Sequence, residues 1–218
     1  MKMTDLTHQI TEEMLLFPGT APVRLERIGK PDGRQTNLFL NNHVGTHIDA
    51  PAHAEIAGKF LEELPLERFF GLALMLDVSE FRGRSIPLEF LEQHADELRF
   101  SQFLVLNSGY HKLWGTEEYM KDFPVLSTEA ALYLASFPEL SGVAMDMLSA
   151  DPADSEELPI HHILLRESKL IVENLANLEA LEGEHFLLSV LPLSFEKADA
   201  SPLRAVAFQA PAGIYYPK

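Results

Sequence analysis

Hydrophobic and polar residues follow one another along this chain in short blocks, most of them the length of a strand. Continuous apolar runs, as expected of strands buried on both faces of a sheet, occur at 71–78 (GLALMLDV), 102–108 (QFLVLNS) and 142–148 (GVAMDML). The pattern predicts further strands at 3–10, 21–28, 36–42, 169–175, 185–192 and 203–209.

Three stretches predict helices. Residues 87–98 begin at Pro87, and proline suits the first position of a helix. Ser127 can cap a helix over 128–136, and a third helix is expected over 159–168. Strands alternate with helices in the middle of the chain, and the ends carry strands only. This order predicts an α/β fold, a single domain over residues 1–218 with a mixed β-sheet core flanked by helices.

Composition excludes several classes of protein. The chain has 17 basic and 33 acidic residues, and its net charge of −16 argues against binding nucleic acid or an anionic membrane surface. It has no cysteine, so disulfides, a thiol nucleophile and cysteine-ligated zinc are excluded. No apolar run approaches membrane-spanning length, and the N-terminus lacks the apolar region of a signal peptide. We therefore expect a soluble, cytoplasmic protein.

The densest group of chemically active residues is HVGTHIDAPAH, residues 43–53. It holds three of the nine histidines, and neutral imidazole and carboxylate are ligands of divalent Zn, Mn and Fe. Glycine, β-branched residues and proline argue against a helix here, and on an extended path His47 and Asp49 point to the same side. Gly45 lets the backbone fold so that His43 can join them. The stretch predicts a metal site, and a histidine-rich polar loop is the alternative.

A second group of polar residues lies more than 100 positions later. On a helix over 159–168, His161 and His162 would point about 100° apart, so only one can face a given site. Glu173 lies within an otherwise apolar strand and needs either a cation or a salt bridge if it is buried. Asp146 poses the same question, either as a pocket residue or as a hydrogen-bonded structural group.

These motifs resemble the metal-dependent cyclase family, which includes bacterial kynurenine formamidases (arylformamidases) and isatin hydrolases. HVGTHIDAPAH has every fixed position of the family pattern His-x-Gly-Thr/Ala-His-x-Asp-x-Pro-x-His. The likeness extends along most of the chain, through Asp5-Leu6-Thr7, Phe17-Pro18-Gly19, Trp114-Gly115-Thr116, Leu126-Ser127, His161 with Glu173 twelve residues later, and Ser201-Pro202-Leu203-Arg204.

The resemblance implies a swivelling β/α/β cyclase-like fold and a set of functional residues. His43, His47 and Asp49 would bind one metal ion, and Asp49 would bridge to a second ion completed by His161 and Glu173. The twelve-residue spacing selects His161 over its neighbour in the sequence. The implied cofactor is Zn or Mn, one or two ions per chain, and the implied assembly is a homodimer or homotetramer.

The resemblance also gives His53 the role of catalytic base and acid, and a role as a further ligand is the alternative. Candidate substrate-binding residues are Phe17, Tyr110, Trp114 and Asp146. The aromatic segment 110–125 is expected on the surface, either as an interface between subunits or as a wall over the active site.

A metal-dependent hydrolase follows from these assignments. A divalent cation lowers the pKa of a bound water toward about 7 and polarises a carbonyl group. His53 could take the proton of that water, leaving hydroxide to attack the carbonyl, and return the proton to the leaving group. The small-molecule substrate would be an aryl formamide or cyclic amide, such as N-formylkynurenine. The alternatives are a lactone or isatin-type cyclic-imide hydrolase, a metal-dependent lyase or dehydratase, and a non-catalytic metal-binding module.

Overall fold

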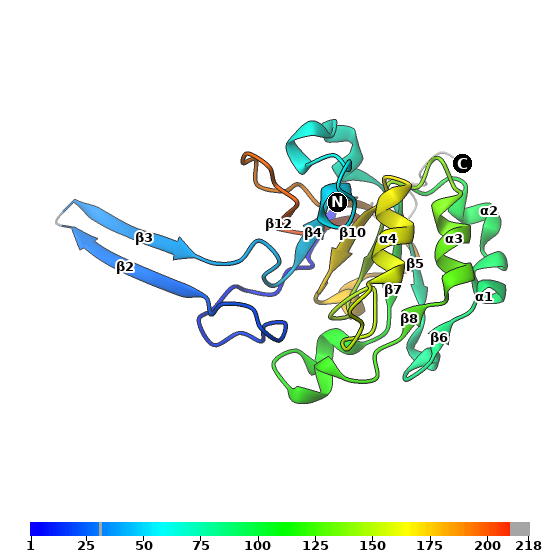
Figure 1. Ribbon diagram of the computed structural model, residues 1–218, viewed down its shortest axis with the longest axis horizontal. Coiled ribbons are helices and arrows are strands. Elements are labelled where there is room, and N and C mark those ends of the chain that lie inside the picture. Colours follow the sequence, from blue (N-terminus) through cyan, green and yellow to red (C-terminus); the bar gives the residue numbers. More distant parts are fainter. Residues whose placement is uncertain (31, 210–218) are drawn as a thin grey trace.

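A mixed nine-stranded β-sheet forms the centre of the computed structural model, which describes residues 1–30 and 32–209 (Figure 1). The central strands β5, β7, β9 and β10 run parallel, and the strands on either side of them pair antiparallel. This arrangement confirms the predicted α/β class with a mixed sheet. In spatial order the strands are β1 (Lys2–Asp5), β13 (Val206–Gln209), β11 (His185–Ser189), β5 (Phe70–Asp77), β7 (Phe103–Asn107), β9 (Gly142–Met145), β10 (Leu170–Glu173), β4 (His47–Asp49) and β12 (Ala200–Pro202).

Both faces of the central strands are buried, as the continuous apolar runs predicted. Along β7, Leu104 and Leu106 face the side that carries the helices, and Phe103 and Val105 face the other. The helices α1 (Leu88–Glu92), α2 (Ala95–Leu98), α3 (Thr128–Ala135) and α4 (Pro159–Arg166) gather on one side of the sheet (Figure 1). Loops and short 3₁₀-helices cover the opposite face.

One predicted helix begins as expected, and another is divided in two. α3 begins where the sequence placed it, and the hydroxyl of Ser127 accepts a hydrogen bond from the backbone N–H of Ala130. The helix expected over 87–98 is instead two short helices, because the backbone at His94 leaves helical geometry (φ −109°, ψ 17°).

An antiparallel hairpin projects from the body of the molecule (Figure 1). It consists of β2 (Arg24–Lys30) and β3 (Gly33–Phe39), in register from Arg24 opposite Phe39 to Lys30 opposite Gly33. Every residue of β3 is exposed. The sequence predicted both strands but not that they pair with each other. The second strand ends at Phe39, so it does not continue directly into the histidine motif.

The segment 110–125 lies at the surface as expected, with Lys112 and residues 115–118 and 121–122 exposed, but most of its aromatic side chains turn into the protein. It folds back after β7 through two 3₁₀-helices, η5 (Tyr110–Leu113) and η6 (Glu117–Met120), and a short strand β8 (Val125–Leu126) that pairs with β6 (Ser85–Ile86). Tyr110, Tyr119 and Phe123 are all buried within the helical-side core.

Strand β4 fixes the place of the histidine motif in this architecture. It lies between β10 and β12, so residues near positions 47, 173 and 200 are brought side by side. Its register sets His47 opposite Glu173 and Asp49 opposite Ile171. Within residues 1–30 and 32–209, none of the helices has the length and apolar character needed to cross a membrane.

Candidate metal centre

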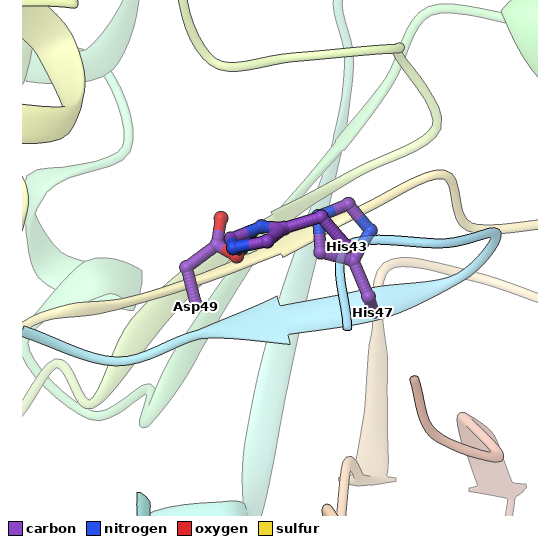
Figure 2. A group of neighbouring side chains, drawn as sticks. All are labelled: His43, His47 and Asp49. Carbon is purple, nitrogen blue, oxygen red and sulfur yellow. Dashed lines mark ion pairs between the residues drawn. The ribbon is translucent and has the colours of Figure 1, made fainter. Parts of the chain in front are cut away.

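Three of the predicted ligands meet at the start of β4, where Figure 2 shows them grouped on one side of the strand. His47 and Asp49 lie two residues apart on the strand and share a face, with 3.5 Å between His47 Nε2 and Asp49 Oδ1. Gly45 takes a left-handed conformation (φ +63°), and the turn brings His43 Nδ1 to 2.9 Å from Asp49 Oδ1.

The distal residues complete the group from two other elements. Glu173, the register partner of His47, places Oε2 3.4 Å from His47 Nε2. His161 on α4 places Nε2 3.3 Å from Glu173 Oε1 and 3.7 Å from Asp49 Oδ2. His162 turns away and pairs with Glu55 instead. The structure therefore brings together all five predicted ligands around the carboxylate of Asp49.

The surroundings of Asp49 fit a divalent cation. Its side chain is 1% exposed, and within the described residues neither carboxylate oxygen has a hydrogen-bond partner. Its nearest polar neighbours are imidazole nitrogens at 2.9–3.7 Å, and burying a carboxylate is costly unless positive charge meets it. Burial raises the pKa of Asp49, but the imidazoles of His47, His161 and His43 outweigh that effect and hold the pKa well below its usual range. A buried anion surrounded by ring nitrogens is a donor set for a metal ion.

The donor atoms form two overlapping groups. Those of His43, His47 and Asp49 lie within 4.8 Å of one another, and so do those of Asp49, His161 and Glu173. Asp49 belongs to both groups, and the residues fit a divalent metal centre.

Two aspartates that the sequence analysis missed hold the histidines in place. Asp151 is fully buried, and its Oδ2 lies 2.7 Å from Nδ1 of His161. Asp199 Oδ2 lies 3.3 Å from His43 Nε2 and 3.5 Å from His53 Nδ1. The available signals were weak: Asp151 precedes a proline-initiated helix, and Asp199 directly precedes the Ala200–Pro202 segment.

His53 lies beside the five predicted ligands (the metal group). Among the described residues, it forms no ion pair with Asp49. It ends the 3₁₀-helix η1 (Pro51–His53), and its ring centroid lies 4.2 Å from that of His43 and 5.8 Å from that of His161. Burial lowers the pKa of His53, and the imidazoles of His43 and His161 add to this effect, although the charge of Asp49 acts in the opposite direction. A neutral ring next to the centre is able to accept a proton.

A cavity of about 320 Å³ opens over the metal group. Its apolar lining includes Phe17, Trp114 and Leu148, so two of the four candidate substrate-binding residues lie on it.

Tyr110 and Asp146 do not line this cavity, in contrast to the expectation from the sequence. The Tyr110 hydroxyl donates to backbone carbonyls at 121 and 122. The carboxylate of Asp146 is fully buried and accepts hydrogen bonds from the backbone N–H and hydroxyl of Ser108 and from Nδ1 of His111. Of the two alternatives for Asp146, a pocket residue or a hydrogen-bonded structural group, the second is correct. Donors from the turn after β7 occupy both of its carboxylate oxygens.

Comparison with known proteins agrees with this geometry. The family model "Cyclase: Putative cyclase" matches residues 4–152, which include the histidine motif. The kynurenine formamidase of Bacillus anthracis is 31% identical over 209 residues, which cover 94% of this chain and 96% of that protein. This chain belongs to the cyclase family. The family expectation drawn from the motifs is confirmed.

Two solved structures share the cyclase fold. Isatin hydrolase A from Labrenzia aggregata, bound to benzyl benzoate, aligns with a TM-score of 0.84 at 23% identity, over 94% of this chain and 93% of that chain. An isatin hydrolase bound to the product analogue thioisatinate aligns with a TM-score of 0.85 at 22% identity, over 94% and 91%. At these identities the likeness establishes the fold.

Proposed function

We propose that this cyclase-family protein is a metal-dependent hydrolase of aryl formamides or related small cyclic amides, with N-formylkynurenine as the leading substrate. The observation that carries the proposal is Asp49, a buried carboxylate without a hydrogen-bond partner among the described residues, ringed by imidazoles at the base of an aromatic-lined cavity. The kynurenine formamidase relative, aligned over 94% of this chain, supports the substrate class.

Five residues would hold the metal. His43, His47 and Asp49 would bind one cation, and Asp49, His161 and Glu173 would bind a second. Imidazole and carboxylate donors suit Zn²⁺ or Mn²⁺. When bound, such a cation supplies a water of lowered pKa and polarises a carbonyl oxygen.

His53 would move the proton. Its Nδ1 faces Asp199, which leaves Nε2 to accept a proton from the attacking water. The same atom would return the proton to the amine nitrogen as the amide C–N bond breaks, so a formamide would yield formate and the free amine. Burial lowers the pKa of His53, and this keeps the ring neutral before the step.

The cavity favours a small planar substrate. Its volume of about 320 Å³ is at the lower end of the range for small-molecule sites, and Phe17, Trp114 and Leu148 offer apolar walls to an aromatic ring. The metal group lies on the same cavity, so a formyl or ring carbonyl can reach it while the ring stays between these side chains.

A substrate panel tests the proposal. Protein loaded with Zn²⁺ or Mn²⁺ is assayed with N-formylkynurenine, formanilide, isatin, a simple lactone and a cyclic imide. We expect the highest kcat/KM with an aryl formamide, and release of formate in step with the amine. A higher kcat/KM with isatin than with the formamides would make a cyclic amide the preferred substrate. Absence of activity of the metal-loaded protein on all five compounds would refute the proposal.

We also propose that two copies associate through the β2–β3 hairpin. Its Leu38 and Phe39 side chains are 63% and 44% exposed, and an isolated two-stranded hairpin is marginally stable in water. Residues 24–39 carry four of the 17 basic residues, whereas the chain as a whole is acidic, so the body of a second copy offers charge complementarity. An interface built on Trp114 and its neighbours fits less well, because Trp114 lines the cavity and Tyr119 is buried.

Light scattering during size-exclusion chromatography tests this association. We expect a dimer or tetramer for the wild-type protein at micromolar concentration, and a monomer for Leu38→Glu. A wild-type monomer would refute the proposed association, and an unchanged oligomer of Leu38→Glu would place the contact elsewhere.

A further inference from the structure

The strongest unassigned feature near the cavity is a stacked pair of rings, His8 and Trp114. Their centroids lie 4.0 Å apart and their planes differ by 8°, so the imidazole lies flat on the indole. Tyr119 packs edge-on against the same indole, with centroids 5.1 Å apart and planes at 79°. The indole that lines the cavity is therefore packed against two rings, one parallel to it and one nearly perpendicular.

The position of His8 is tied to the strand that carries the metal group. The backbone N–H of His8 donates to Oγ1 of Thr46 (2.9 Å), and this hydroxyl donates to the backbone carbonyl of Asn174 (2.6 Å). Thr46 and Asn174 are direct neighbours of His47 and Glu173 in the chain. One hydrogen-bonded unit thus sets the distance between the aromatic wall and the metal group.

The imidazole of His8 is uncharged at neutral pH. Burial, together with the charge of His111, lowers the pKa of His8 to about 4, although Asp146 acts in the opposite direction. Nε2 of His8 is buried and has no hydrogen-bond partner among the described residues. His8 consequently packs on the indole as a flat, neutral plate rather than as a cation.

We propose that His8 is a positioning residue of the substrate pocket, which holds Trp114 as a flat wall against which the aryl group of the substrate packs. The inference deepens the proposed function and rests on it, since it concerns how an aryl formamide is distinguished from an alkyl one. His8 does not line the cavity and acts through Trp114.

Two substitutions keep or remove the planar ring at position 8. His8→Phe keeps a planar ring that can stack, and His8→Ala removes it. We compare formanilide with N-butylformamide, which has no ring. Aromatic pairs contribute enough to binding that His8→Ala should raise KM for formanilide about three- to tenfold, with kcat nearly unchanged. For N-butylformamide the change should stay below about twofold, and His8→Phe should restore KM for formanilide.

Trp114 is the chain's single tryptophan, so tryptophan fluorescence, excited selectively over the five tyrosines, reports on this residue alone. We expect the emission of His8→Ala to shift to longer wavelength and its anisotropy to fall, because the indole loses one of its packing faces. The affinity of metal-loaded protein for 2-aminobenzoate, measured by fluorescence quenching, should fall about three- to tenfold in His8→Ala and recover in His8→Phe.

These measurements keep the two proposals apart. If formanilide is not hydrolysed but 2-aminobenzoate still binds more weakly to His8→Ala than to His8→Phe, the proposed activity fails and the role of His8 stands. If hydrolysis proceeds and His8→Ala changes neither KM nor the emission, the role of His8 is refuted. Equal losses for both formamides would also refute it. Should His8→Ala fail to fold, His8→Leu fills the space without a planar ring and gives the same comparison.

Discussion

Asp151 orients His161, one of the predicted ligands, but does not belong to the metal group itself. The side chain is fully buried, and its two oxygens accept three hydrogen bonds. Oδ1 accepts from the backbone N–H of Ile160 (2.9 Å), and Oδ2 accepts from the backbone N–H and Nδ1 of His161 (3.0 and 2.7 Å). Two of these donors are N–H groups of the first turn of α4, which have no partner within the helix. The third bond fixes the ring so that Nε2 faces Glu173.

The expected losses of stability and of metal affinity follow from the hydrogen bonds that each substitution removes. Asp151→Asn keeps one acceptor oxygen but turns an NH₂ group toward a buried N–H donor, so the free energy of unfolding should fall by about 1–3 kcal/mol. Asp151→Ala removes every partner of the three donors and should lower it by about 3–5 kcal/mol. Because the imidazole of His161 is no longer fixed, metal affinity should fall about 10- to 100-fold.

Urea unfolding in the presence of a chelator measures the free energy of unfolding without metal. Titration of the folded variant with Zn²⁺ measures its metal affinity. Asp154→Asn is the matched control, since Asp154 lies in the same loop and is exposed, and it should change stability by less than about 0.5 kcal/mol. If Asp151→Asn binds Zn²⁺ as tightly as the wild-type protein, Asp151 does not orient His161 and the reasoning is wrong.

Three further substitutions test the site. His47→Ala should lose most of the bound metal by elemental analysis, and full occupancy would contradict its role as a ligand. His53→Ala should keep its metal and fold while kcat falls by a factor of about 10² to 10⁴, and loss of metal in step with activity would make His53 a ligand instead. A Cβ at Gly58 would lie 2.4 Å from the carbonyl carbon of Pro51, so Gly58→Ala should shift η1 and lower the free energy of unfolding by about 1–3 kcal/mol. Gly29→Ala, with open space around the new methyl group, is its control, and equal stability of the two variants would refute this argument.

The sequence predicted best where one physical signal dominated. The run 71–78 is apolar at nearly every position because β5 is covered on both faces, and the structure gives Phe70–Asp77. The histidine motif was readable because it concentrates ligand-type side chains, and Gly45 marks the turn that its left-handed backbone makes.

Features that depend on residues far apart in the sequence could not be predicted from the sequence. Strand β4 has only three residues, too few for a periodic pattern, and its pairing with β10 and β12 is set by the rest of the sheet. Asp146 and Asp151 are both fully buried carboxylates, although Asp146 follows an apolar run and Asp151 lies in a polar loop. The fold supplies Asp146 with donors from the turn after β7 and Asp151 with donors from the start of α4, and neither set can be read from nearby residues.

The register of β4 against β10 limits how this chain can change in length. His47 and Glu173 meet because they are directly opposite each other, and successive residues of a strand point to opposite faces. Inserting or deleting one residue inside either strand would carry a ligand to the other face of the sheet, where no neighbouring substitution could bring it back. The β2–β3 hairpin is not part of this sheet, so residues added there leave the register of β4 untouched and affect only the proposed contact between copies. Length variation among descendants of this sequence should therefore accumulate in the hairpin and stop at the two ligand-bearing strands.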